Sequence, residues 1–414
     1  MKILIVSNGY GRHARGGAEL AATSLASMLD QKGHEITVLT SAGPADSEGW
    51  ELPSSGRSIR IYRSRLPYPY HYTPTCDRSV LSKARWHFQD HFQTAIVKHL
   101  GLVLESFQPD VVNTHNVQGL GYSVLGEIGK LGLPVVQVLH DLSLSCMNAF
   151  MFRQKQECER LCFPCRASHF IKSKYLADIS RLSFWSPSQA LLNRMKPLLP
   201  EHAIAARVIP LPLTFAPPKN RSVPPASLNL LYVGRIEPAK GVGFILEILA
   251  ELSCRFSFHM TLVGAGSDLS ALQNRYGMHK WLTITGHVSA EDVGTYMANA
   301  DVLMVPSLWT ENSPLVIYQA ISLGLPILAS DVGGLAELVG KNMNGDLLPR
   351  GDRAAWFERL IQMSEDPGLV SRWKRNANRY RNRFDPNELT DKVLDLFEET
   401  IQSQMPLRLV EEAG

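Results

Sequence analysis

The chain has 414 residues, of which 45% are hydrophobic and 20% are charged, and its formal net charge is +3. This length suits two or three domains, and the composition is that of a soluble globular protein. No apolar run approaches the roughly 18 residues that span a bilayer, and the first apolar stretch is too short for a signal peptide, so we expect a cytoplasmic protein with reduced thiols.

The charge is unevenly distributed along the chain. Residues 1–200 hold 22 Lys and Arg against 15 Asp and Glu, whereas the remainder holds 20 against 24. A basic half attracts an anionic partner, such as a membrane surface or a phosphorylated acceptor. An incidental excess of surface charge explains the same numbers, and the sequence leaves both explanations open. We expect no nucleic acid among the partners.

Strand and helix patterns alternate in the first half of the chain. Residues 2–6 predict a strand, residues 18–31 a helix and residues 35–40 a second strand. Further strand-like runs occupy residues 111–112, 135–138 and 207–209, with helical patterns between most of them. This alternation predicts a parallel sheet covered by helices.

The alternation restarts after a proline-rich segment, residues 210–225, which suits a linker better than the interior of any element. Strand patterns then follow at 228–233, 257–263, 281–285, 302–305 and 326–329, with a helical pattern at 241–252. We therefore predict two α/β domains, residues 1–212 and 227–385, joined by a linker at 213–226. Residues 386–414 form a last helix and tail that can pack on either domain.

Two glycine motifs lie near the N-terminus. Gly9-Tyr10-Gly11 fails as a dinucleotide fingerprint, because the third glycine before a helix is missing. Gly16 and Gly17 directly precede the first predicted helix, where small residues let backbone amides approach an anion at the positive helix end. An ordinary tight loop is the alternative.

The second domain opens with Arg235 and Lys240 after its first strand, and Gly264 follows its second strand. The carboxyl ends of parallel strands are where open α/β sheets bind ligands. Two fixed cations there can reach one diphosphate and stabilise the charge that develops when it leaves. A glycine turn lets a nucleotide approach the backbone. Most surface cations are merely solvated, so the pair alone is a moderate signal.

The strongest segment is residues 306–320. Asn312 or Ser313 can cap a helix that has Pro314 in its first turn, which places Glu311 beside the positive helix end. Glu311 can then orient sugar hydroxyls, and Gln319 can bond ribose hydroxyls. A helix cap followed by a surface glutamine is the alternative.

Together these segments resemble the retaining glycosyltransferases of family 4, which have the GT-B fold: two Rossmann-like domains with parallel sheets facing a central cleft. The resemblance covers nearly the whole chain, through residues 16–19, 140–141, 234–241, 311 and 331–334. It implies that Arg235 and Lys240 hold the donor diphosphate and that Glu311 contacts the donor sugar. It also implies a catalytic role for His140, facing the transferred sugar, and donor contacts from the backbone near Asn312, Ser313, Pro314 and Leu315.

The resemblance implies transfer of a sugar, with retention of configuration, from a UDP- or GDP-sugar to a hydroxyl of a glycan or lipid-linked acceptor. It implies no catalytic metal or other cofactor. One departure is Gln319, where the family usually has a glutamate. That departure leaves open a catalytically degenerate partner subunit, and a GT-B epimerase that acts on a sugar nucleotide is a further alternative.

Four cysteines fall within twenty residues: Cys146, Cys158, Cys162 and Cys165. In a reducing compartment such a cluster suggests a structural zinc site more than disulfides. A redox pair in the CxxC segment and plain buried thiols remain alternatives.

Basic and aromatic residues gather between residues 57 and 92. The basic residues are Arg57, Arg60, Arg63 and Arg65, and the aromatic ones are Tyr68, Tyr70, Tyr72, Trp86, Phe88 and Phe92, the last three within a helical pattern at 82–100. This mixture suits peripheral contact with the inner face of a membrane that holds a lipid-linked acceptor. A solvated loop followed by a core-facing helix is the alternative.

Overall fold

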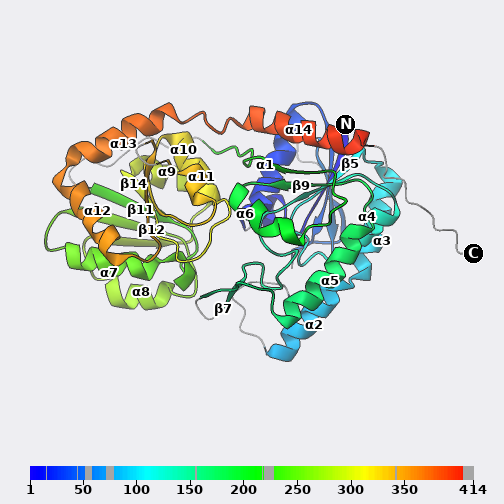
Figure 1. Ribbon diagram of the computed structural model, residues 1–414, viewed down its shortest axis with the longest axis horizontal. Coiled ribbons are helices and arrows are strands. Elements are labelled where there is room, and N and C mark those ends of the chain that lie inside the picture. The colour runs from blue at the N-terminus through cyan, green and yellow to red at the C-terminus, as the bar shows by residue number, and fades with distance from the viewer. Residues whose placement is uncertain are drawn as a thin grey trace, which may run out of the picture. The chain divides into compact units, whose positions relative to one another are not determined.

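The computed structural model describes residues 1–403 apart from 15, 44, 52–57, 71–78, 154–155, 217, 219–227 and 341–342. The chain divides into two compact units. Unit 1 comprises Met1–Arg153, Cys158–Pro212 and the chain from Pro386 onward, and unit 2 comprises Gln154–Glu157 and Leu213–Asp385. Most of the predicted linker lies outside the described residues, and the last helix belongs to unit 1 (Figure 1).

The strands of unit 1 form one sheet, in which eight strands lie in the order β10-β9-β6-β5-β1-β2-β4-β3 among the described residues. Neighbours are parallel, except that β3 pairs antiparallel with β4 at one edge. The strands β5, β6 and β9 are buried along their whole length, as expected for a sheet covered on both faces. The bounds are β1 Lys2–Ser7, β2 Glu35–Ser41, β3 Gly49–Glu51, β4 Arg60–Ser64, β5 Val111–Thr114, β6 Val135–Val138, β9 Leu182–Ser186 and β10 Ala205–Val208.

Helices cover this sheet and bury its apolar side chains. Leu4, Val6 and Val112 belong to one large core cluster, whereas Ile3 and Ile5, which alternate with them on β1, are buried outside that cluster. Helix α14 contacts both α1 and four of the strands, while α3, α4 and α5 are successive neighbours (Figure 1). The bounds are α1 Gly17–Gln31, α2 Val80–His91, α3 Thr94–Ser106, α4 Ser123–Lys130, α5 Phe163–Ala177, α6 Gln189–Met195 and α14 Pro386–Gln402, with the short 3-10 helices η1 Gly11–His13 and η2 Lys196–Leu198. A separate two-stranded sheet pairs β7 Phe152–Arg153 with β8 Gln156–Glu157.

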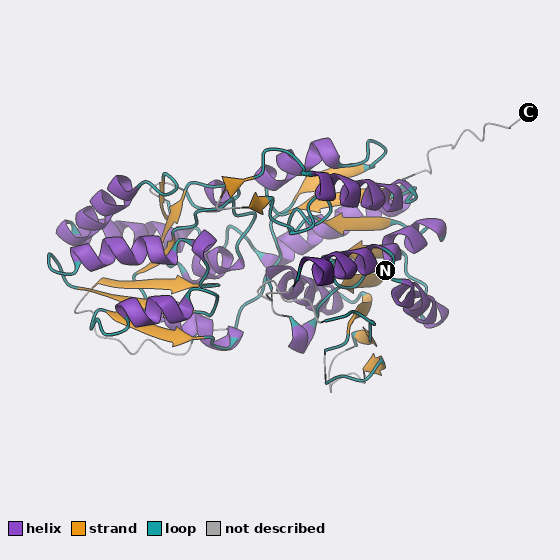
Figure 2. Ribbon diagram, turned by 90° about the horizontal axis from the view of Figure 1, so that it is seen from below, coloured by secondary structure: helices purple, strands orange, loops and turns teal. Residues whose placement is uncertain are grey.

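Unit 2 contains a second sheet, whose six strands among the described residues are all parallel, in the order β13-β12-β11-β14-β15-β16. Figure 2 shows these strands with helices packed around them. The strands are β11 Leu228–Val233, β12 Phe258–Val263, β13 Leu282–Gly286, β14 Val302–Val305, β15 Ile327–Ser330 and β16 Gly345–Leu348. The helices are η3 Pro238–Lys240, α7 Val242–Leu252, α8 Leu269–Tyr276, α9 Ala290–Asn299, α10 Leu315–Leu323, α11 Leu335–Leu338, α12 Arg353–Glu365 and α13 Pro367–Arg379.

The predicted α/β class with two parallel sheets is confirmed. The strands β3, β4, β9 and β16 of the two main sheets were not predicted from the sequence. The helix predicted at 82–100 is in fact two helices, α2 and α3, which are separated at Phe92 and Gln93. In the part of the chain that the structure describes, no helix is both long enough and apolar enough to cross a membrane.

Candidate active site

The polar groups of unit 2 gather where β11 and β14 end. Gly241 has a φ of +72°, and a Cβ on it would lie 1.8 Å from the carbonyl oxygen of Pro306, so only glycine allows this approach. The N–H of Leu308 donates to the carbonyl of Ala239 over 2.8 Å. These contacts hold η3, and with it Lys240, against the segment that follows β14.

Glu311 is the centre of this group. Its Oε1 accepts hydrogen bonds from Lys240 Nζ at 2.7 Å, Ser307 Oγ at 2.6 Å and Trp309 Nε1 at 2.8 Å. Burial alone would raise the pKa of the Glu311 carboxyl, but Lys240, with help from the other two donors, holds that pKa below its ordinary value. Glu311 is therefore a buried carboxylate, and no described residue donates to its Oε2.

Trp309 brings the two predicted cations onto one surface. Lys240 Nζ lies 4.7 Å and the Arg235 guanidinium carbon 5.6 Å from the centroid of its ring. Arg235 is also paired with Glu237 at 2.9 Å, and about two fifths of its side chain is exposed. The structure thus brings Arg235, Lys240 and Glu311 together, as a diphosphate next to a sugar would require.

Gly264 follows β12 and lies against Gly234. Its φ is +143°, and a Cβ there would come within 1.8 Å of the Gly234 carbonyl oxygen, so this turn requires glycine. The two strand ends β11 and β12 therefore leave bare backbone side by side next to Arg235.

The helix that follows Glu311 begins later than predicted. The expected cap by Asn312 or Ser313 is wrong: α10 starts at Leu315 with Pro314 as its N-cap residue and no side-chain cap. Proline disfavours helical backbone in the residue before it, which keeps Ser313 outside the helix. The Ser313 hydroxyl instead lies 2.7 Å from the Tyr318 hydroxyl.

Gln319 lies within α10 and is 8% exposed. Its side-chain amide makes no hydrogen bond to any described residue, and its Nε2 lies near Gly294 of α9. The amide is therefore available to a polar ligand, and bonding of ribose hydroxyls by Gln319 remains a prediction.

His140 follows β6 in unit 1, and its Nε2 lies 2.8 Å from Nδ1 of His115, which follows β5. Burial lowers the pKa of His140 to about 3 and that of His115 well below its ordinary value, so both rings are neutral at pH 7. A cavity beside them is lined by residues that follow both strands, among them Asn116, Asp141 and Ser143.

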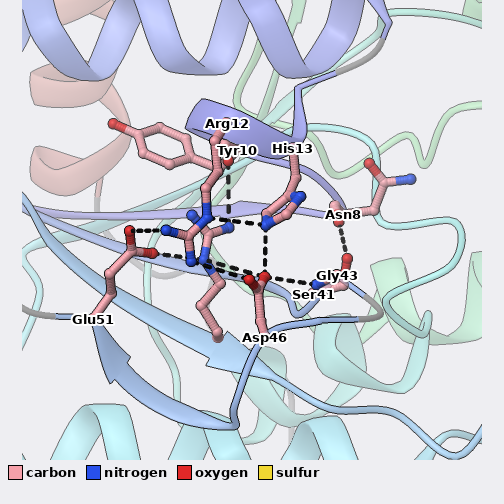
Figure 3. Close-up of polar contacts among 9 residues, drawn as sticks. Asn8, Tyr10, Arg12, His13, Ser41, Gly43, Asp46 and Glu51 are labelled. Atoms are coloured by element: carbon pink, nitrogen blue, oxygen red, sulfur yellow. Dashed lines mark hydrogen bonds and ion pairs between the residues drawn. The ribbon is translucent and has the colours of Figure 1, made fainter.

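Figure 3 shows a polar network at the same edge of the unit 1 sheet. Asp46 accepts from the Gly43 N–H at 2.8 Å and pairs with Arg12 at 3.0 Å and His13 at 2.6 Å. Burial would raise the pKa of Asp46, but the Gly43 N–H and the neighbouring His13 and Arg12 lower it below its usual range. The network ties the loop after β2 to the loop that leads from β1 to Gly16.

Gly16 and Gly17 stand at the start of α1 as predicted, and the Gly16 N–H donates to the carboxylate of Glu19. The chain's own carboxylate therefore occupies this helix end. Binding of an anion there remains a prediction.

The cysteine cluster does not have the geometry of a metal site. Among the described residues, no three His, Cys, Asp or Glu side chains are grouped to hold an ion. Cys146 and Cys165 are buried with their sulfurs 3.8 Å apart, whereas Cys158 is partly exposed and Cys162 exposed. The structure gives no support to the structural zinc predicted at Cys146, Cys158, Cys162 and Cys165.

The basic and aromatic stretch is only partly internal: Arg63 and Trp86 are buried and cannot meet a membrane, whereas Arg65 is exposed. Arg63 is buried in β4 and pairs with Glu51 at 2.6 Å, and the Arg60 guanidinium lies 4.5 Å from the Trp50 ring. Trp86 is buried beneath Tyr68, whose ring is 5.2 Å away. Phe88 and Phe92 are exposed, and Arg57 and Tyr72 lie outside the described residues.

Sequence reasoning assigned no role to Ser307, Trp309, His115 or Asn113. Ser307 and Trp309 lie in the same short segment as Glu311. Their proximity in the sequence could have suggested them as hydrogen-bond donors to the Glu311 carboxylate. Asn113 lies in β5 and His115 directly follows it, and β5 is parallel to the strand before His140. The two-residue spacing at this strand end was the available signal.

Comparisons with known proteins agree with this geometry. Residues 15–171 match the family model described as Glycosyltransferase Family 4, and residues 227–366 match that of Glycosyl transferases group 1. The phosphatidyl-myo-inositol mannosyltransferase of Mycolicibacterium smegmatis is 22% identical over 391 residues, which cover 94% of this chain and 92% of that protein.

Solved structures share the whole fold. The sucrose-phosphate synthase of Thermosynechococcus elongatus has a TM-score of 0.73 at 19% identity, covering 96% of this chain and 98% of the other. Anabaena HepE, solved in complex with UDP-glucose, has a TM-score of 0.65 at 16% identity, covering 96% and 99%. Glycosyltransferase models thus match both halves of the chain, which belongs to the family 4 glycosyltransferases and has the GT-B fold.

Proposed function

We propose that this glycosyltransferase moves a sugar from a nucleotide-sugar donor to an acceptor hydroxyl with retention of anomeric configuration. The observation that carries the proposal is the group around Glu311. Three donors saturate Oε1 of this buried carboxylate, while no described residue donates to Oε2. A buried anion with one oxygen left over is suited to accept hydrogen bonds from sugar hydroxyls.

Arg235 and Lys240 supply the other half of the donor site. In the proposed reaction, the bond from the sugar C1 to the diphosphate oxygen breaks, and a bond from C1 to the acceptor oxygen forms on the same face. The acceptor proton passes to the leaving diphosphate oxygen, and the two cations stabilise the charge that develops there. Gln319 bonds the ribose, and His140 contacts the transferred sugar.

The test begins with donor binding and turnover. A thermal-shift screen against UDP, GDP, ADP and their sugars identifies the base, and UDP-glucose is tried first because Anabaena HepE was solved with it. Release of the nucleoside diphosphate is then measured for Arg235→Ala, Lys240→Ala and Glu311→Ala. We expect each to lose about a hundredfold or more in rate.

Arg275→Ala is the matched control, because Arg275 makes an exposed ion pair with Glu247 elsewhere in unit 2. Near-wild-type turnover in the Arg235 and Lys240 variants would remove the diphosphate assignment. Absence of both nucleotide binding and donor hydrolysis would favour a degenerate partner subunit. Conversion to a new sugar nucleotide without diphosphate release would identify an epimerase.

For the acceptor, we propose a glycan or lipid-linked hydroxyl reached at an anionic membrane. Helices α2 and α5 are neighbours in unit 1 (Figure 1), and their buried faces are joined where His91 lies 2.8 Å from Ser168. We call the exposed side chains of these two helices and of Phe92, which directly follows α2, the helix-pair surface. Its apolar side chains are between 45% and 85% exposed: Val80, Leu81, Phe88, Phe92, Phe163 and Phe170.

The charge of the helix-pair surface fits the same partner. Lys83, Arg85, Arg166 and Lys174 are exposed among the apolar residues, and the only carboxylate in these two fully described helices, Asp90, is buried. Exposed aromatic side chains with basic neighbours bind the interface of anionic bilayers. We therefore propose that the helix-pair surface contacts the membrane, and that the buried Arg63 and Trp86 do not.

Sedimentation with vesicles tests this surface. Wild-type protein should bind phosphatidylglycerol vesicles and bind phosphatidylcholine vesicles weakly, and the double variant Phe88→Ser/Phe163→Ser should lose most of that binding. Met278→Ser is the control, because Met278 is 96% exposed in unit 2. Undiminished vesicle binding by the double variant would overturn the assignment. It would also be overturned if the wild-type protein associates with itself in the absence of vesicles and the double variant does not.

A further inference from the structure

Three side chains of unit 1 form a hydrogen-bonded row across the ends of β5 and β6. Asn113 Nδ2 lies 2.9 Å from the carbonyl oxygen of Val136, and Asn113 Oδ1 lies 2.9 Å from His115 Nε2. His115 Nδ1 lies 2.8 Å from His140 Nε2, and the two ring planes are inclined by only 22°. Nearly parallel rings suit a bond along an in-plane lone pair.

The row has one consistent placement of protons. The Val136 carbonyl can only accept, so the Asn113 atom that faces it is the NH₂ group, and the atom facing His115 is the amide oxygen. That oxygen can only accept, so His115 carries its proton on Nε2. His115 is buried and neutral, so its Nδ1 is an acceptor, and His140 must donate from Nε2.

We infer that Asn113 and His115 are positioning residues, which hold His140 as the Nε2–H tautomer in one ring orientation. This inference rests on the proposed function in so far as His140 contacts the transferred sugar. His140 is the member of the row that is partly exposed, whereas His115 is 1% exposed. In the held tautomer the His140 Nδ1 carries a lone pair and no proton, so this atom can act only as a hydrogen-bond acceptor.

Nitrogen NMR of the imidazole rings tests the tautomers without any substrate. Protein labelled with ¹⁵N in its histidines is recorded at pH 7, and the two signals are assigned by their loss in His115→Asn and His140→Asn. We expect both rings as Nε2–H tautomers. An Nδ1–H tautomer or a charged ring at either position would overturn the inference, whether or not the enzyme transfers a sugar.

Substitution then separates positioning from folding. In His115→Leu we expect His140 to populate both tautomers and kcat to fall by about tenfold, the effect of one lost neutral hydrogen bond, with the donor KM nearly unchanged. His115→Asn, which can offer an oxygen where Nδ1 lies, should restore most of the kcat. His99→Leu, a buried histidine of unit 1 outside the row, is the control. An unchanged His140 tautomer in His115→Leu would refute the positioning role, and loss of kcat without that change would point to a folding effect instead.

Discussion

Trp309 organises more of the proposed donor site than any residue predicted from the sequence. Its indole N–H donates to Glu311, and its ring face carries Lys240 and Arg235. One rigid side chain therefore fixes an anion and two cations before any ligand arrives. Preorganisation of this kind reduces the cost of binding a charged ligand.

Substitution of Trp309 should separate these two contributions. Trp309→Phe keeps an aromatic face but loses the N–H, and Trp309→Leu loses both. A cation–π contact is worth about 0.5–2 kcal/mol and a hydrogen bond to a charged group about 1.5–3 kcal/mol. We expect nucleoside diphosphate affinity, measured by calorimetry, to fall several-fold in the first variant and more than tenfold in the second.

Trp281→Phe is the control, because the Trp281 indole N–H has no hydrogen-bond partner among the described residues. Equal affinities in wild type and Trp309→Leu would mean that the ring does not position the cations.

The Glu311 carboxylate should also make unit 2 sensitive to acid. Its pKa lies below the ordinary value of 4.5, so its stabilising contribution is fully present above that pH and is lost as the pH falls through the folded pKa. Glu311→Gln leaves Lys240 without its anion and should cost about 3 kcal/mol of unfolding free energy at pH 7. Denaturant unfolding should show that this difference shrinks below pH 4.5.

Glu247→Gln, at an exposed ion pair of unit 2, should change stability little at either pH. A Glu311→Gln difference that stays constant from pH 7 to pH 4 would contradict the ionised, paired state of this carboxyl.

Elements with an uninterrupted apolar pattern could be predicted from the sequence. Elements that are stabilised by contacts with residues distant in the sequence could not. Strands such as β1 and β14 are runs of buried apolar residues with glycine or proline turns nearby. The strand β4 contains Arg60 and Arg63, which resemble a solvated loop until Glu51 and the Tyr10 carbonyl are known to pair with Arg63. The strand β9 is short and contains serines at both sides of its aromatic pair.

The same reasoning applies to the site. Arg235, Lys240 and Glu311 lie in two short segments whose strand-then-turn pattern fixes their place at the sheet edge. The start of α10 was misplaced because helix-capping residues were given priority over the backbone restriction that Pro314 imposes on Ser313.

Helix α10 places Gln319 where its amide has no partner among the described residues. If Gln319 bonds the ribose, Gln319→Glu should tighten nucleotide binding by less than tenfold, because a stronger hydrogen bond is offset by the desolvation of a nearly buried carboxylate. Gln319→Ala should weaken it. Calorimetry with UDP and GDP measures both, and Gln362→Glu, at an exposed position on α12, is the control.

Affinity that is unchanged in both Gln319 variants would show that this position does not touch the nucleotide. Binding that appears only in Gln319→Glu would instead identify the wild-type chain as a degenerate homologue.

The molecule consists of two units with separate cores, and the chain returns to unit 1 at its end. Helix α14 buries Leu389, Val393, Leu396 and Phe397 there, and Thr400 bonds Ser183 of β9 at 2.8 Å. The amphipathic pattern of this helix was visible in the sequence. Its partner was not, because either domain offers an apolar surface to such a helix.

Because α14 packs on unit 1, shortening one of its buried side chains should lower the stability of that unit alone. Phe397 is fully buried, and Phe397→Ala should cost about 3–5 kcal/mol, a large part of the 5–15 kcal/mol that stabilises a typical domain.

Calorimetric melting in the presence and absence of a bound nucleotide identifies the transition of unit 2, since a ligand raises only the transition of the unit that binds it. We expect Phe397→Ala to lower the other transition and to leave nucleotide affinity unchanged, while Lys392→Ala on the exposed side of α14 leaves both transitions in place. A variant that lowers the nucleotide-sensitive transition instead would show that α14 stabilises unit 2.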